Sequence, residues 1–189
     1  MRVFRSRKNK VVLTEEGIIR KTFASATACD KEAEALVALQ GNHAPVLLSR
    51  QDLVIETSYI EGDLLLERYL CASCEKAAEL ATMLANTILS IYTSLNRITF
   101  DENFRNYIVA KEKIYRVDFE EVTEGDLEQW CAKLFAFATL YDTDDQVKTV
   151  FIRTLQNILP LRKERLSAAY QKELSALAAR WRKRYPKNI

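Results

Sequence analysis

The sequence predicts an α+β fold of two lobes, with a small sheet-rich lobe first and a mainly helical lobe after it. Three observations predict this fold. Strand-like runs interrupted by one helical segment fill the first 58 residues, helical periodicity dominates from residue 63 onward, and one short hairpin interrupts the helices near residues 99–120. We therefore place an N-lobe, a sheet with one helix, at residues 1–58 and a reduced C-lobe at residues 59–189.

The N-lobe is predicted from two pairs of apolar runs joined by polar turns. The four runs cover residues 11–13, 18–23, 46–48 and 53–57. Glu15-Glu16-Gly17 separates the first pair and Ser49–Asp52 the second, which is typical of hairpins. Between the hairpins, residues 26–40 change to helical spacing, with Ser25 or Thr27 as the capping residue.

The C-lobe is predicted from a change to the period of an amphipathic helix. The predicted elements are a helix over 63–96, an irregular segment over 99–106, a hairpin of 107–109 with 114–117, and helices over 127–159 and 161–184. In the first helix, Leu80, Leu84 and Ile88 recur on one face. Pro160 separates the last two helices because proline interrupts helical hydrogen bonding.

The composition is that of a soluble globular protein. The 189 residues are 48% hydrophobic and 29% charged, with a formal net charge of +2, which suits one good core or two small lobes. The sequence contains no apolar run of about 18 residues, the length that a membrane-spanning helix requires, and we recognise no secretory signal. We therefore expect a cytoplasmic protein. Basic residues gather at both termini, where they would meet an anionic partner or RNA, or simply face solvent.

Four cysteines are present, and two of them have the spacing of a metal or redox motif. Cys71-Ala-Ser-Cys74 lacks a second cysteine or histidine pair nearby, and the single histidine, His43, is distant in the sequence. We therefore expect Cys29, Cys131 and this pair to be small buried thiols.

The strongest chemical signal lies in the irregular segment and the hairpin after it. Asp101 stands five residues before Asn106, an apolar strand follows, and Asp118 ends the second strand of the hairpin. Phosphoryl transfer from ATP needs an acceptor oxygen held in line and metal ions that neutralise charge between the phosphates. A carboxylate for the acceptor hydroxyl, with amide and carboxylate oxygens for magnesium, meets that need. Each residue alone is also typical of a turn or a cap.

This segment resembles the catalytic loop and metal-binding strand end of the protein-kinase-like superfamily. The likeness extends to aminoglycoside and choline phosphotransferases and to small atypical kinases, such as lipopolysaccharide kinases and a kinase of tRNA modification. Their pattern is Asp, four residues, Asn, a hairpin, and then Asp-Phe-Gly or Asp-Phe-Glu, as at Asp118-Phe-Glu120. The resemblance implies a two-lobed kinase-like fold, Asp101 as catalytic carboxylate, and Asn106 and Asp118 as magnesium ligands.

The resemblance continues upstream in the same order and covers about residues 10–140. The run that contains Lys21 is similar to the strand whose lysine contacts the ATP phosphates. The segment with Glu32 is similar to the helix that carries its glutamate partner. Arg20 and Glu34, which are close neighbours in the sequence, are the alternatives to these two residues. An ordinary surface ion pair between Lys21 and Glu32 would contribute little.

The resemblance also implies an adenine site. Leu53–Gly62 is similar to the hinge between kinase lobes, where backbone groups bind the base. The residues assigned to this contact are Ser58, Tyr59 and Ile60.

Three features depart from the kinase pattern. The turn at Arg5–Asn9, which would cover the phosphates, contains no glycine, although glycine lets a backbone approach phosphate closely. Thr99 and Phe100 stand where a histidine or arginine is common. Glu120 replaces a glycine, and it would be either an extra metal ligand or a solvated turn residue.

Three functions follow from these observations. The first is an ATP-dependent phosphotransferase that passes the γ-phosphate to a hydroxyl of a small molecule or cell-surface component. The second is a kinase-like binding module with little or no catalysis that acts through partners. The third is a nucleic-acid-associated protein that uses the basic termini, and a small atypical kinase associated with RNA modification is a related alternative.

Overall fold

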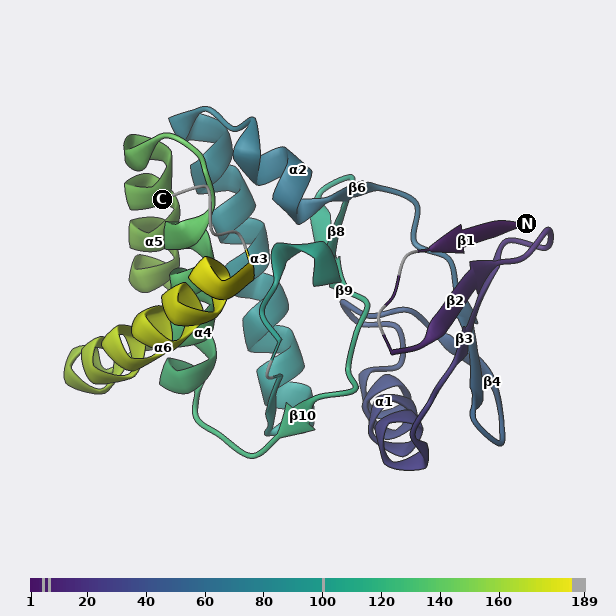
Figure 1. Ribbon diagram of the computed structural model, residues 1–189. Helices are drawn as coiled ribbons and strands as arrows, with labels where there is room; N and C mark the ends of the chain where they lie inside the picture. The colour runs from purple at the N-terminus through teal and green to yellow at the C-terminus, as the bar shows by residue number, and fades with distance from the viewer. Residues whose placement is uncertain (5, 7, 100, 185–189) are drawn as a thin grey trace.

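The computed structural model describes residues 1–4, 6, 8–99 and 101–184 and shows two lobes (Figure 1). One lobe is a sheet with a single helix, and the other is mainly helical with two small sheets. The predicted α+β, two-lobed fold is confirmed.

The N-lobe is built on one antiparallel sheet of five strands. Its elements are β1 (Arg2–Phe4), β2 (Lys10–Leu13), β3 (Ile18–Thr22), α1 (Ala26–Leu39), β4 (Leu47–Gln51) and β5 (Val54–Ser58). The strand order is β1-β2-β3-β5-β4, so β3 lies at the centre. Helix α1 begins after Ser25, whose side chain accepts a hydrogen bond from the amide of Ala28 and so caps the first turn.

The second hairpin of the N-lobe differs from the sequence prediction in the length of its turn. Strand β4 continues to Gln51, so the turn is formed by Asp52 and Leu53 and not by residues 49–52. Asp52 has φ of +51°, a left-handed conformation that a short polar side chain tolerates. The polar residues at 49–51 therefore belong to an exposed edge strand.

The C-lobe contains most of the helices. Its elements are β6 (Asp63–Leu64), α2 (Leu65–Leu70), α3 (Cys74–Leu95), β7 (Ile98–Thr99), the 3-10 turn η1 (Phe104–Asn106), β8 (Tyr107–Ala110), β9 (Lys113–Arg116), β10 (Val122–Thr123), α4 (Leu127–Leu140), α5 (Asp145–Ile158) and α6 (Lys163–Arg184). The predicted hairpin is present as β8 and β9, with β6 added at its edge, and β7 pairs with β10.

Two of the helices predicted from the sequence are each divided in the structure. The segment 63–96 breaks before α3, where the Ser73 side chain accepts from the amide of Lys76. The segment 127–159 breaks before α5, where Asp144 accepts from two amides of the first turn. A capping side chain accepts hydrogen bonds from the free amides at the start of a new helix. One helix can therefore end and another begin although the spacing of apolar residues in the sequence continues unchanged.

The cysteines are free, and only some of them are buried. Cys29 and Cys131 are buried as expected, but Cys71 is exposed and Cys74 is half-buried. Ser73 between these two caps α3. The spacing of the pair therefore reflects the join of two helices.

The core of the C-lobe surrounds helix α4. Trp130 and Phe135 on α4 are fully buried, as is Ile88 on α3 and Phe151 on α5. Helix α6 crosses the outer side of α4 (Figure 1), where the ring of Trp181 lies 5.7 Å from that of another aromatic residue at the end of α4. Each fully buried large apolar side chain stabilises the fold by about 1.5–3 kcal/mol.

Among the residues that the structure describes, no helix combines the length and apolar character that crossing a membrane requires.

Candidate active site

The centre of the candidate site is a buried ion pair between the sheet and helix α1. The Lys21 ammonium lies 2.7 Å from a carboxylate oxygen of Glu32, with the two side chains 10% and 4% exposed. Strand alternation turns Arg20 to the other face, where it pairs with its cross-strand neighbour Glu56. Since Glu34 is exposed, the structure favours Lys21 and Glu32 over their neighbours, and the interpretation as a surface pair is wrong.

The same lysine also binds two carboxylates of the C-lobe. Its ammonium lies 3.2 Å from Asp118 and 3.0 Å from Glu120, both on the segment that follows β9. An ammonium has three protons, and here three carboxylates surround it. We call Lys21, Glu32, Asp118 and Glu120 the Lys21 cluster.

The Lys21 cluster carries more negative than positive charge. Burial opposes the charge on Lys21, but the attraction of Glu32, Asp118 and Glu120 is larger in sum and raises its pKa. Burial raises the pKa of Glu32 to about 7, although Lys21 partly offsets this effect. The raised pKa of Lys21 indicates that the three carboxylates keep its ammonium group charged, and the excess of carboxylates suits an additional cation.

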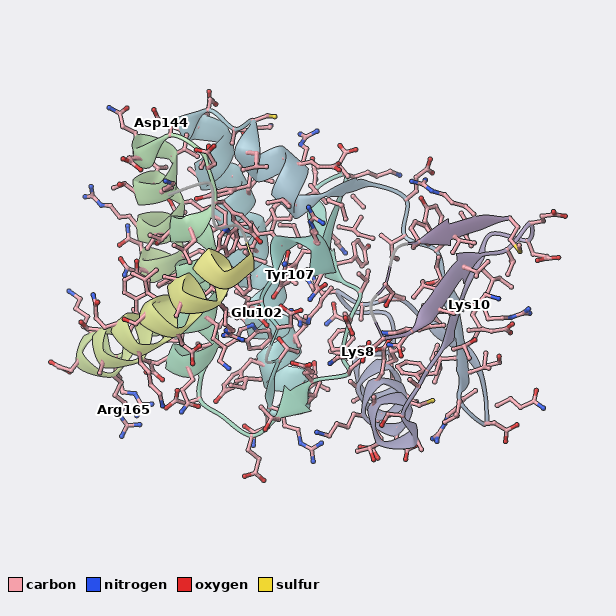
Figure 2. All side chains as sticks on the ribbon, viewed as in Figure 1. Lys8, Lys10, Glu102, Tyr107, Asp144 and Arg165 are labelled. Carbon is pink, nitrogen blue, oxygen red and sulfur yellow. The ribbon has the colours of Figure 1, made fainter. Side chains whose placement is uncertain are left out.

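Glu120 is not the solvated turn residue that the sequence allowed. Its side chain is only 13% exposed. It forms an ion pair with Lys21 and accepts a hydrogen bond from the side chain of Asn9. The Lys8 ammonium lies 3.0 Å from Glu121, and Figure 2 shows Lys8 where the two lobes meet. The turn without glycine therefore contacts the segment after Asp118. Arg5 and Arg7 of this turn lie outside the described residues.

Asp101 and Asn106 are joined in one turn around η1. The Asn106 side-chain nitrogen donates to the carbonyl oxygen of Asp101 at 3.0 Å, and the Asp101 carboxylate accepts from the amide of Asn103 at 3.2 Å. Asp101 is exposed and Asn106 is half-buried. Since the amide nitrogen of Asn106 is used in the turn, its oxygen is the atom that a metal ion would meet. Phe100, before Asp101, lies outside the described residues.

One side chain connects this turn with the Lys21 cluster. Arg116, at the end of β9, donates from Nη2 to the carbonyl oxygen of Asp101 at 2.8 Å. It donates from Nε to the carbonyl oxygen of Asp118 at 2.9 Å. The backbones of the two aspartates therefore lie within reach of a single guanidinium group.

Sequence reasoning missed the buried network that holds Arg116. The carboxylate of Glu102 accepts from Arg116 at 3.0 Å and also from the hydroxyls of Thr99 and Tyr107. The side chains of Arg116 and Glu102 are 2% and 0% exposed. Figure 2 shows Glu102 and Tyr107 together in the middle of the molecule. We call Thr99, Glu102, Tyr107 and Arg116 the Arg116 cluster.

Strand alternation contained a signal for part of this network. Tyr107 and Arg116 are cross-strand partners, as are Val109 and Ile114, and all four are buried. Arginine at an inward position of an otherwise apolar strand predicts a buried acidic partner. The sequence does not identify that partner as Glu102, because Glu102 lies in an irregular segment.

One of the predicted adenine contacts already makes hydrogen bonds within the N-lobe sheet. The amide of Ser58 donates to the carbonyl of Val46 at 2.9 Å, and the Ser58 hydroxyl accepts from the amide of Val46. The backbone amide of Ser58 is therefore used to join β4 to β5, and a contact of Ser58 with adenine through its other backbone group stays a prediction. Tyr59 and Ile60 follow β5 outside any helix or strand and keep their assignment as a prediction.

Comparison with known proteins was informative only at the level of structure. No family model matches the chain, and no curated protein matches it significantly. Aminoglycoside phosphotransferase APH(2'')-Ib with bound ADP matches at a TM-score of 0.66 and 14% identity, over 91% of this chain and 80% of that one. The ternary complex of APH(2'')-IIa with streptomycin and ATP matches at 0.68 and 13%, over 98% and 88%. WbdD with a kinase inhibitor matches at 0.58 and 12%, over 85% and 46%.

These likenesses, at low sequence identity, define the fold. The chain has the two-lobed fold of the protein-kinase-like superfamily. Its structural neighbours include aminoglycoside phosphotransferases whose structures contain ADP or ATP.

Proposed function

We propose that the chain is an ATP-dependent phosphotransferase that passes the γ-phosphate to a hydroxyl group of a small molecule or a cell-surface component. The observation that supports this most is the Lys21 cluster, where a buried lysine–glutamate pair of the N-lobe meets Asp118 of the C-lobe. Such a pair holds an ammonium group at a fixed position for phosphate oxygens. The boundary between the lobes is proposed at residues 58 and 59.

The residues present fit a magnesium ion. Asp118 is 34% exposed, and Asn106 turns its amide nitrogen toward Asp101, which leaves oxygen as its ligand atom. Magnesium prefers carboxylate and carbonyl oxygens and keeps several waters. We assign Asn106 and Asp118 as its ligands, with Glu120 as an additional carboxylate nearby. Bound magnesium would neutralise charge between the β- and γ-phosphates.

The proposed reaction uses the exposed carboxylate of Asp101 as a proton acceptor. The acceptor hydroxyl oxygen forms a bond to the γ-phosphorus while the bond from that phosphorus to the β–γ bridging oxygen breaks, and ADP leaves. Asp101 takes the hydroxyl proton. Lys21, held by Glu32, would offset charge on the phosphates. Tyr59 and Ile60 would bind adenine through their backbone groups.

A kinase-like binding module is the second candidate, because of how Lys21 is engaged. Its ammonium group donates hydrogen bonds to Glu32 and Asp118 and lies 3.0 Å from the carboxylate of Glu120. A nucleotide phosphate must therefore replace one carboxylate before it contacts the ammonium group. A module that holds nucleotide without turnover would keep this arrangement.

An anionic or RNA partner at the basic C-terminal segment stays a prediction. Arg162, just before α6, lies 2.7 Å from Glu128 of α4, so part of the positive charge of this segment is neutralised within the fold. The cytoplasmic location also stays a prediction.

The decisive experiment is a thermal-shift titration with ATP, with and without magnesium. The wild type is compared with Asp118→Asn and with Asp145→Asn, a control at a side chain that is 94% exposed on α5. A ligand that binds only the folded state raises its stability by mass action, by about 2.7 kcal/mol at 100 times Kd. We expect a magnesium-dependent shift in the wild type and the control that is lost in Asp118→Asn.

Turnover separates the two candidates. Slow release of phosphate from ATP to water should be measurable in the wild type and lost in Asp101→Asn, which should still bind nucleotide. A magnesium-dependent shift without any turnover would favour the binding module. No shift of the wild type at millimolar ATP would contradict nucleotide binding altogether.

A further inference from the structure

Two segments of the candidate site, 101–106 and 117–120, lie between the β8–β9 hairpin and the β7–β10 pair and are bridged there by one side chain. The pairing of β8 with β9 continues to the contact between the Val117 amide and the Asn106 carbonyl, at 3.0 Å. Beyond this contact the chain leaves the strands on both sides. There Arg116 donates to the carbonyls of Asp101 and Asp118 and so connects the two sides.

Arginine suits this connection better than lysine. The guanidinium group is planar and rigid, and its donors point in three directions. In Arg116, Nη1 donates to Glu102 at 3.0 Å and to the Tyr107 hydroxyl at 2.8 Å, while Nη2 and Nε reach the two aspartate carbonyls. An ammonium is a single point and does not span the same acceptors.

Glu102 fixes the guanidinium in this orientation. It is the residue directly after Asp101, it is completely buried, and its carboxylate accepts from Arg116 and from two hydroxyl groups. One positive and one negative charge balance within the Arg116 cluster. Because the cluster is sealed and balanced, it has no place for a ligand, and its remaining role is to hold the backbone.

We propose that Arg116 is a positioning residue that sets the distance between Asp101 and Asp118, and that Glu102 holds it in place. This inference rests on the proposed function, in which Asp101 takes the proton and Asp118 holds the metal. Binding of magnesium and nucleotide uses Lys21, Asp118 and Asn106 and does not use the carboxylate of Asp101. Phosphoryl transfer depends on both aspartates at the correct separation.

The test uses a double variant that removes both charges, Arg116→Met with Glu102→Gln. Removing the pair together avoids an unpaired buried charge. The matched control is Arg162→Met with Glu128→Gln, which removes an arginine–glutamate pair between α4 and the start of α6. A third variant, Arg116→Lys, keeps the charge beside Glu102 but does not span both carbonyls.

Two readouts are measured on folded protein. Amide hydrogen exchange is followed at 103–106 and 117–120, and we expect it to accelerate at least tenfold in both segments in the double variant and not in the control. Hydrolysis of ATP by water is followed in parallel. We expect kcat to fall about 100-fold in the double variant and in Arg116→Lys, with KM for ATP changed less than threefold.

The outcomes separate this inference from the proposed function. Unchanged exchange in both segments would overturn the inference, whatever the protein does with ATP. Full turnover in Arg116→Lys would also overturn it, because charge alone would then suffice. Accelerated exchange in a protein whose wild type neither binds nor hydrolyses ATP would support the placement of the two segments by Arg116 and contradict the proposed function.

Discussion

Two buried groups of charges lie close together in this molecule, and they differ in balance and in access to solvent. The Lys21 cluster has one ammonium and three carboxylates, and Asp118 within it is 34% exposed. The Arg116 cluster has one guanidinium and one carboxylate, which are 2% and 0% exposed. The first joins the two lobes, and the second lies within the C-lobe alone.

The difference indicates what each group does. Unbalanced negative charge with a path to solvent attracts a cation, and a phosphate can follow that cation. A balanced and sealed pair gains nothing from a ligand, but its hydrogen bonds fix the backbone around it. Binding is therefore expected at the Lys21 cluster and positioning at the Arg116 cluster.

The largest expected effect is on stability after loss of one partner in the sealed pair. Arg116→Met leaves Glu102 buried without its counter-charge, which costs about 3–5 kcal/mol. Lys21→Met should cost less than half as much, because Glu32 accepts a proton near neutral pH and Asp118 reaches solvent. Urea denaturation of both variants at pH 7 measures the difference. Equal losses would remove the distinction between the two clusters.

The next effect is a pH dependence that only the Lys21 cluster should show. The pKa of Glu32 is about 7 in the folded protein, against 4.5 without the fold. The folded state therefore holds this proton more tightly than the unfolded state, and the contribution of Glu32 to stability decreases as pH rises from about 4.5 to about 7. The change is on the order of 2–3 kcal/mol. The pKa of Lys21 is raised from 10.5 and does not act in this window.

Glu32→Gln isolates this contribution from all other titrating groups. We expect the free energy of unfolding of this variant, relative to wild type, to increase between pH 5 and pH 8. Urea titrations at three pH values measure it. A constant difference over this range would mean that Glu32 stays ionised in the folded protein.

A smaller effect concerns Glu120, whose carboxylate forms an ion pair with the ammonium group of Lys21. Glu120→Gln removes one negative charge beside the ammonium group, so ATP without magnesium should bind several-fold more tightly. Glu121→Gln is the matched control, because Glu121 pairs with exposed Lys8 and not with Lys21. Calorimetry with ATP in the presence of a chelator measures both. Equal affinities of the two variants would show that Glu120 does not compete with phosphate.

Sequence reasoning predicted the fold well because local periodicity determines it. The hairpins, helix α1 and the β8–β9 hairpin follow directly from apolar spacing and turn residues. Two errors lie at Ser73 and Asp144, where a capping side chain begins a new helix without glycine or proline, and a third lies in the turn between β4 and β5. The pairing of β7 with β10 was also missed, because each strand has only two residues and joins distant segments.

The candidate site was predicted less completely because its contacts are tertiary. Order and spacing indicated Lys21, Glu32 and Asp118, and the structure brings these three together. Spacing contained no sign that Glu120 turns inward to the same lysine. It also gave no partner for Arg116, since Glu102 lies 14 residues away in an irregular segment.

The smallest expected effect is at the exposed rim of the Lys21 cluster. Lys8 and Glu121 are 68% and 43% exposed, and their hydrogen bond is the main reason that the pKa of Lys8 is raised. Exposed pairs are screened by water and salt, so Lys8→Met should change the free energy of unfolding by less than about 0.5 kcal/mol. Urea denaturation at low and high salt measures this change. A loss of more than about 1 kcal/mol in the free energy of unfolding that persists at high salt would mean that the turn without glycine holds the lobes together. The exposed pair of Lys8 and Glu121 would then stabilise the fold as much as a buried ion pair does.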